Sequence, residues 1–87
     1  MAKRIPCQVP FCKRTAPDRG QDEVICGKHW RLADRSLTRR YKALAKWINR
    51  HKDDPAVERR TLARRWHTAA RAWRRIKTQA IERAMGI

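Results

Sequence analysis

The feature that most constrains the fold is a set of four potential metal ligands in the first third of the chain. Cys7 and Cys12 are separated by four residues, Cys26 and His29 by two, and thirteen residues lie between the two pairs. Structural Zn²⁺ sites are closed tetrahedra of thiolate and imidazole, and ligands a few residues apart can share one turn of backbone. The spacing therefore predicts one structural zinc ion held by Cys7, Cys12, Cys26 and His29.

The three cysteines have two other interpretations, namely one disulfide with a free thiol, or small buried side chains. An odd number of cysteines does not complete a disulfide framework, and no apolar segment of a secretory signal follows the basic start of the chain. A chain of 87 residues buries a limited core and often depends on a staple such as a metal. The zinc interpretation is therefore favoured.

The sequence around the ligands predicts a small, irregular finger. Residues 7–12 are typical of a knuckle, with Phe11 shielding the metal, and turn residues within 13–25 predict a short β-hairpin. Cys26 and His29 are expected on the first turn of a helix, whose N-terminus favours the thiolate form of a cysteine. The first six residues are expected to be a short basic arm.

This order of knuckle, hairpin and helix is that of a treble-clef zinc finger. The pattern Cys-x4-Cys, a variable hairpin and Cys-x2-His-Trp resembles small zinc-binding proteins found in bacteria and their phages. The resemblance covers about the first third of the chain, and the first knuckle is wider than in the all-cysteine treble clef. It implies the metal and the scaffold but no single function, because treble clefs serve nucleic-acid binding, protein binding and nucleases alike.

The rest of the chain predicts two amphipathic helices. From residue 35 to residue 51 the apolar side chains recur in steps of four, three and four, which is one helix face. Asp54 is a good N-cap and Pro55 a good first helical residue, so the last helix is predicted from Pro55 to about Met85. Its predicted seam, the row of apolar side chains that faces the partner helix, comprises Leu62, Trp66, Ala69, Trp73, Ile76 and Ala80.

The short connection between these helices predicts an antiparallel hairpin. At 1.5 Å per residue the first helix spans about 25 Å and the last about 45 Å, so the end of the last helix is expected beside the finger, with Trp30 packed between them. The predicted fold is mainly α, with a treble-clef-like finger containing a short β-hairpin, then a helical hairpin with a long basic C-terminal helix. Residues 1–34 are the zinc module and residues 35–87 the helical hairpin packed against it as one compact unit.

Positive charge is concentrated in the helical part of the chain. Of the formal net charge of +15, residues 35–87 contribute sixteen Lys/Arg against four Asp/Glu, and no acid lies between Arg59 and Lys77. Such self-repulsion predicts a polyanionic partner, and arginine-rich helix faces are typical of phosphate contacts. The predicted nucleic-acid contacts are Arg39, Arg40, Lys46, Arg50, Arg60, Arg64, Arg65, Arg71, Arg74, Arg75 and Lys77.

These features indicate a binding protein and argue against an enzyme. Zinc with four protein ligands has no open position for water, and no apolar run approaches the roughly 20 residues of a membrane span. The favoured function is a zinc-stabilised, cytoplasmic or nucleoid-associated protein that binds duplex DNA, such as a transcriptional regulator of a bacterium or phage. The alternatives are an RNA- or ribonucleoprotein-binding module and an adaptor on an acidic protein surface such as an RNA polymerase subunit. Neither a small-molecule substrate nor a membrane partner is expected.

Overall fold

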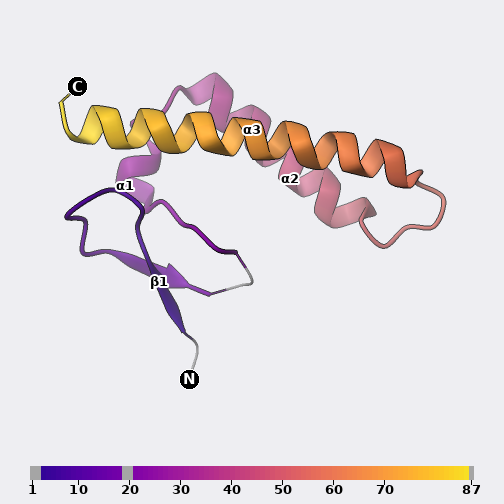
Figure 1. Cartoon of the computed structure of the whole chain (residues 1–87), viewed down its shortest axis with the longest axis horizontal. Coiled ribbons are helices and arrows are strands. Elements are labelled where there is room, and N and C mark those ends of the chain that lie inside the picture. The colour runs from indigo at the N-terminus through magenta and orange to yellow at the C-terminus, as the bar shows by residue number, and fades with distance from the viewer. Residues whose placement is uncertain (1–2, 19–20, 87) are drawn as a thin grey trace.

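The chain folds into a long helical hairpin with a small finger attached to one end of it. The computed structural model describes residues 3–18 and 21–86. Figure 1 shows α3 along the whole length of the molecule, α2 beside it, and the finger near the C-terminal end of α3. The predicted fold class is therefore confirmed. The elements in chain order are β1 (Arg4–Pro6), β2 (Thr15–Pro17), α1 (Gly27–Trp30), α2 (Arg35–His51) and α3 (Arg59–Ala84).

The β-hairpin encloses the first knuckle instead of following it. Strands β1 and β2 pair antiparallel, with Ile5 opposite Ala16, so the knuckle of residues 7–12 lies within the connection 7–14 between the strands. The ladder continues past the strands, because the amide of Cys7 donates to the carbonyl of Arg14 at 2.9 Å. The position predicted for the hairpin was therefore wrong.

The error has a physical cause in the shortness of the strands. Strands of three residues, each with only its middle residue partly buried, carry no alternating hydrophobic pattern. Their pairing is reinforced by Arg4, whose Nε donates to Thr15 Oγ1 at 2.7 Å. Residues 4–6 of the expected basic arm are thus part of the sheet, whereas residues 1–2, and residues 19–20 of the predicted hairpin, lie outside the described residues.

Helix α2 has the predicted bounds and buries the predicted face. Leu44 and Ile48 are buried against Ala69 of α3. Tyr41, Trp47 and Leu62 pack around this cluster while remaining partly exposed. The antiparallel hairpin of the sequence analysis therefore exists, with its core on the predicted seam.

Helix α3 begins at Arg59, four residues after the predicted start at Pro55. Asp54 does cap the backbone, but it caps a turn, because its Oδ1 accepts a hydrogen bond from the amide of Ala56 at 2.9 Å. The amide of Val57 then donates to the carbonyl of Asp54 at 3.2 Å, which closes the turn. An Asp-Pro pair suits such a turn as well as it suits a helix start.

The buried side of α3 differs from the predicted seam at Trp66, which is 59% exposed. Ala72 takes its place among the buried residues of the helix, whose deepest members are Ile76 and Ala80, both 0% exposed. Small side chains let α3 approach its neighbours closely along this side. Among the described helices none is long and apolar enough to cross a membrane.

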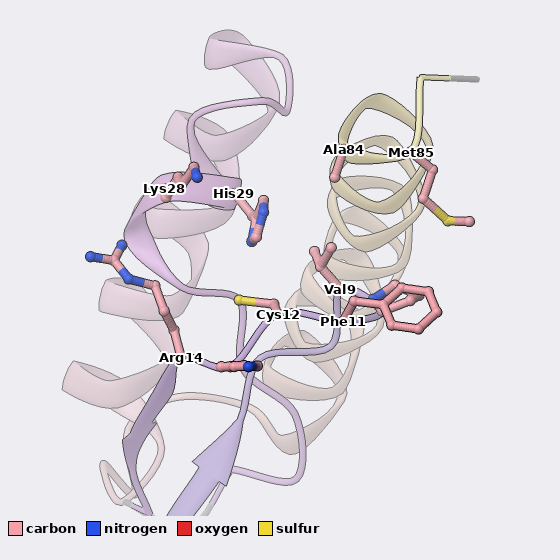
Figure 2. Close-up of a pocket in the computed structure, with 10 residues that line it drawn as sticks. Val9, Phe11, Cys12, Arg14, Lys28, His29, Ala84 and Met85 are labelled. Carbon is pink, nitrogen blue, oxygen red and sulfur yellow. The ribbon is translucent and has the colours of Figure 1, made fainter.

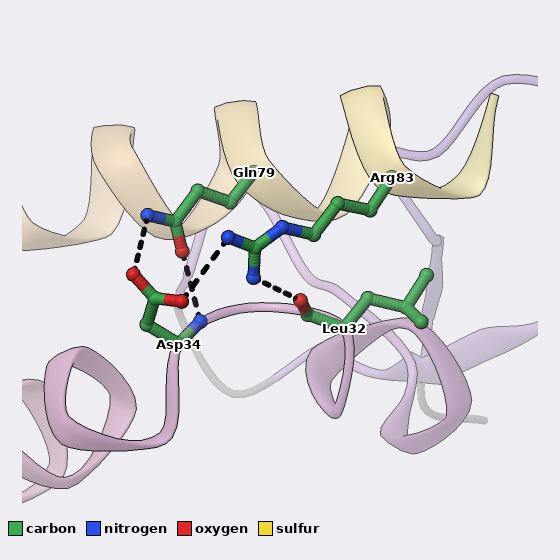
Figure 3. Close-up of polar contacts among 4 residues, drawn as sticks. All are labelled: Leu32, Asp34, Gln79 and Arg83. Atoms are coloured by element: carbon green, nitrogen blue, oxygen red, sulfur yellow. Dashed lines mark hydrogen bonds and ion pairs between the residues drawn. The ribbon is translucent and has the colours of Figure 1, made fainter. Parts of the chain in front are cut away.

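The far end of α3 is fastened to the chain segment between α1 and α2, as Figure 3 shows. The amide of Asp34 donates to Gln79 Oε1 at 2.9 Å, and Gln79 Nε2 returns a bond of 3.1 Å to Asp34 Oδ2. Arg83 donates to Asp34 Oδ1 at 3.1 Å and to the carbonyl of Leu32 at 2.6 Å. Hydrogen bonds from Arg83 and then Gln79 hold the pKa of Asp34 below its usual value. The prediction that α3 overshoots α2 and returns beside the finger is confirmed.

We expect Ile76→Ala to lower the free energy of unfolding of the metal-loaded protein by about 2–5 kcal/mol, because it leaves a cavity at a fully buried site. That is a large part of the roughly 5–15 kcal/mol that stabilises a typical domain. Denaturant unfolding followed by far-UV circular dichroism measures the change. Thr78→Ala, two residues away and exposed, is the control and should change the free energy by less than about 0.5 kcal/mol. Equal effects of the two substitutions would contradict the assignment of the core.

Candidate metal centre and basic surface

The four predicted ligands converge on one point. Their donor atoms all lie within 4.8 Å of one another. The Sγ atoms of Cys12 and Cys26 are 3.9 Å apart, and His29 Nδ1 lies 3.7 Å from Cys7 Sγ and 3.2 Å from Cys26 Sγ. A tetrahedral zinc ion would separate two sulfur ligands by about 3.8 Å and a sulfur and a nitrogen by about 3.6 Å. The cluster is therefore compatible with a single zinc ion, and all three cysteines are free thiols.

Two short backbone motifs present these ligands. In the knuckle, the amide of Cys12 donates to the carbonyl of Val9 at 3.1 Å across a turn whose third residue, Phe11, has a φ of 67°. With Pro10 at its second position this is a type II turn. The second pair sits on α1, where Cys26 is the N-cap and His29 lies within its single turn.

Backbone amides donate hydrogen bonds to sulfur atoms of the cluster. The amide of Cys26 donates to Cys7 Sγ at 3.3 Å. Burial acts to raise the pKa of Cys26, but the hydrogen bond from the His29 amide and the neighbouring thiols outweigh it and lower that pKa to about 6. Cys26 therefore ionises readily and is suited to bind a metal at neutral pH.

The electrostatics of Cys12 indicate how a bound cation would favour ionisation of the clustered thiols. A hydrogen bond from the Arg14 amide favours its thiolate, yet burial together with Cys7 and Cys26 raises the pKa of Cys12 above its usual value. Several thiolates this close repel one another, so they can all ionise only when a positive charge lies among them. The electrostatics of the cluster thus match a bound divalent cation.

Phe11 does not shield the metal as predicted, because its side chain is 97% exposed. The buried apolar residues of the finger are Val9 and Val24, at 4% and 7% exposure. Val24 also bridges to Cys7 in parallel pairing, so it joins the two ligand-bearing segments. The hydrophobicity of the two side chains could not predict that Val9 is buried and Phe11 is exposed.

The segment that carries the second ligand pair is locked onto α3. Glu23 accepts hydrogen bonds from Trp73 Nε1 at 3.0 Å and from Lys77 Nζ at 2.7 Å, and its pKa is lowered, first by Lys77 and then by Trp73. Trp30, which follows the last ligand, packs with its ring centroid 6.0 Å from Tyr41 and 6.1 Å from Trp73. The predicted place of Trp30 between the finger and the helices is confirmed.

Five of the predicted nucleic-acid contacts form an exposed row on α3. At 100° per residue these positions lie opposite the buried Ala69 and Ile76. From its first to its last arginine the row extends for about 22 Å along the helix axis. We call it the α3 stripe, and it consists of Arg60, Arg64, Arg71, Arg74 and Arg75, all exposed.

A second row lies on α2, on the side opposite Leu44 and Ile48. It consists of Arg39, Lys46 and Arg50, with Arg40 on its flank, and all four are exposed. Because Leu44 and Ile48 pack against Ala69 of α3, the two rows face away from each other across the hairpin. The cations predicted to bind nucleic acid are therefore divided between two surfaces.

The remaining two predicted contacts are engaged within the protein. The Arg65 guanidinium lies over the Trp47 ring at 4.8 Å from its centroid. Lys77 forms its ion pair with Glu23, with 29% of its side chain exposed. Neither residue belongs to the α3 stripe.

Comparison with protein-family models, with curated proteins and with solved structures found no match. The resemblance in ligand spacing to small zinc proteins of bacteria and phages thus gains no support from these comparisons. Function is inferred from the cluster and the charged surfaces of this chain alone.

We expect His29→Gln to weaken zinc binding by more than about a hundredfold, because loss of an outer hydrogen-bond partner of a ligand alone costs 10- to 100-fold. Competition with a chromophoric zinc chelator measures the affinity. His67→Gln is the control, since this exposed histidine lies outside the cluster and its substitution should leave the affinity unchanged. Unaltered zinc affinity in His29→Gln would exclude His29 as a ligand.

Proposed function

We propose that the protein is a zinc-stabilised binder of duplex DNA that contacts the phosphates through the α3 stripe. One observation carries the proposal, namely a row of five exposed arginines on one side of a helix whose residues 59–77 contain no acid. None of the salt bridges among the described residues involves an arginine of this row. Cations without acidic partners on one face favour a polyanion as ligand.

The shape of the row favours a DNA duplex over an RNA duplex. The major groove of B-DNA is about 12 Å wide and admits an α-helix, whose diameter with side chains is about 10–12 Å. The corresponding groove of A-form RNA is deep and too narrow for side chains to read. Arginines along 22 Å of a straight helix, estimated from its rise per residue, are suited to lie along or in the DNA groove.

Phosphate contact is the main interaction that these residues can supply. Arginine forms bidentate bonds to phosphate, which position a protein on DNA without reading its sequence. Among amides that could read adenine, Gln79 is engaged by Asp34 and Asn49 lies on α2. We therefore propose binding with little sequence specificity through α3.

In this proposal the metal is structural and the protein is not an enzyme. Zinc is the proposed ion because three thiolates and one imidazole suit its tetrahedral, closed coordination. It would hold the finger against the C-terminal half of α3 and so keep the α3 stripe straight and rigid. The proposed compartment is the cytoplasm, where the DNA is, and regulation of transcription is one role that such binding would serve.

Docking on an acidic protein surface is the second candidate function, and the α2 row favours it. Arg39, Lys46 and Arg50 face away from the α3 stripe, so they remain accessible when α3 lies against DNA. An acidic partner on this side would join the protein to a larger assembly.

Replacing Arg60, Arg64, Arg71 and Arg75 by Gln should weaken binding to a short duplex and reduce its salt dependence. If each arginine neutralises one phosphate, the slope of log K against log salt becomes shallower by about 3–4. Fluorescence anisotropy titrations at several salt concentrations measure both quantities. Circular dichroism should be unchanged, because all four side chains are exposed.

The matched control removes four charges from α2 through Gln at Arg39, Arg40, Lys46 and Arg50. Its salt slope should differ from that of the unaltered protein by less than about 1, because this row faces away from the bound duplex. If the α2 variant lost more DNA affinity than the α3 variant, the DNA-binding surface would lie on α2. Equal slopes in all three proteins would argue against DNA binding through either row.

A further inference from the structure

A cavity of about 670 Å³ opens between the knuckle and the end of α3. Figure 2 shows Phe11 and Met85 on one side of it, Arg14 and Lys28 on the other, and Cys12 between them. Two of the four cluster residues, Cys12 and His29, line the cavity, so it opens directly beside the candidate metal site. It was not anticipated from the sequence, because its walls come from segments more than 50 residues apart.

Phe11 is the least expected residue of this cavity. It is 97% exposed, so its ring contributes almost nothing to the core. Its φ of 67° lies in the left-handed region, at a turn position that favours Gly or Asn. The Phe11 side chain does not pack in the core, and its backbone conformation is unfavourable for an aromatic residue. Contact of the ring with an external ligand would account for the presence of Phe at this position.

The surroundings of Phe11 indicate the chemistry of that ligand. The cavity is lined by three exposed cations, Lys13, Arg14 and Lys28, and by no acidic side chain. Met85, 52% exposed, adds a soft apolar edge beside the ring. An exposed aromatic face with flanking cations is the combination that binds single-stranded nucleotides, through base stacking and phosphate contact.

The cavity lies in line with the α3 stripe. Met85 follows Arg74 by eleven residues, which is about three helical turns, so it lies on the same side of α3 and roughly 16 Å further along. A nucleic acid that follows the stripe toward the C-terminus of the helix would pass the exposed Glu82 and then reach the cavity.

We infer that this cavity, which we call the Phe11 cleft, holds one unpaired or unstacked base of a bound nucleic acid. The base stacks on Phe11, and the adjoining phosphates contact Lys13, Arg14 and Lys28. The inference rests on the proposed function in one respect: the α3 stripe and the Phe11 cleft would bind the same nucleic acid. Its ligand is a single-stranded segment at a duplex end or junction.

The test compares a blunt DNA duplex with the same duplex carrying a three-nucleotide overhang that contains 2-aminopurine. The unaltered zinc-loaded protein should bind the overhang duplex at least about fivefold more tightly than the blunt duplex, which corresponds to the smallest affinity gain expected from stacking one base. Binding should also quench the 2-aminopurine fluorescence. Phe11→Asn should abolish both effects while leaving binding to the blunt duplex unchanged. Phe11→Trp should retain both.

The Asn variant is designed to keep its fold. Asn tolerates a positive φ better than Phe does, and almost no buried surface is removed, so its thermal midpoint should be equal or higher. Zinc content is measured on the same sample. The four-arginine variant of the α3 stripe is the second control: it should weaken binding to both duplexes but still quench the probe at saturation.

The possible outcomes separate this inference from the proposed function. Equal binding of both duplexes without quenching would overturn the Phe11 cleft and leave duplex binding in place. Binding of a single-stranded 2-aminopurine oligonucleotide that depends on Phe11, with no binding to the blunt duplex, would support the cleft and overturn the duplex proposal. Absence of all binding would overturn both. Capture of an acidic aromatic peptide instead, lost in Phe11→Asn, would assign the cleft to a protein ligand and overturn the inference.

Discussion

Closure of the four-ligand cluster is the constraint on which the rest of the structure depends. The finger has two strands of three residues and one helical turn, and two of its four ligands, Cys26 and His29, are on that turn. The donor atoms of three thiols and an imidazole lie within 4.8 Å of one another, and thiolates this close repel, a repulsion that a bound cation would offset. Between the two ligand pairs lies Glu23, and just after the second pair lie Trp30 and Asp34, all of which contact α2 or α3. A metal ion in this cluster would therefore support the finger and, through it, the docking of the long helix.

The positions of the acidic residues determine which cations of α3 form ion pairs within the protein and which do not. Glu23 and Asp34 are two of only eight acids in the chain, and both bind the C-terminal half of α3, through Lys77 and Arg83 respectively. The arginines of the α3 stripe form no direct salt bridge among the described residues, although the charge of Arg75 helps to lower the pKa of Asp34. Long-range repulsion along the stripe is thus opposed at one end of the helix by the two ion pairs and the apolar contacts of Ile76 and Ala80. The same arrangement that secures α3 leaves its basic face unneutralised and so available to a polyanion.

Much of this architecture was predictable because it depends on spacing and length. The ligand set followed from the intervals between Cys7, Cys12, Cys26 and His29, and the bounds of α2 followed from its apolar period. The return of α3 beside the finger followed from the unequal helix lengths. The hairpin was misplaced because strands of three residues have no period to detect, and the start of α3 was misplaced because Asp54 caps a turn as well as a helix. Counting arginines could not show that α2 and α3 present them on opposite sides.

Two aromatic residues that hydrophobicity assigned to the interior lie outside it, and their positions are informative. Trp66 is 59% exposed on α3, and Phe11 is 97% exposed on the knuckle. A single exposed aromatic residue on a helix needs no special cause, because much of any folded surface is apolar. Phe11 differs because its positive φ is also unfavourable for a phenylalanine. Its exposed side chain and its backbone conformation are therefore both atypical of this residue type. Local rules that fail together at one residue are expected at functional sites rather than at random positions. At Phe11, therefore, the stability of the fold alone does not account for the residue that is present.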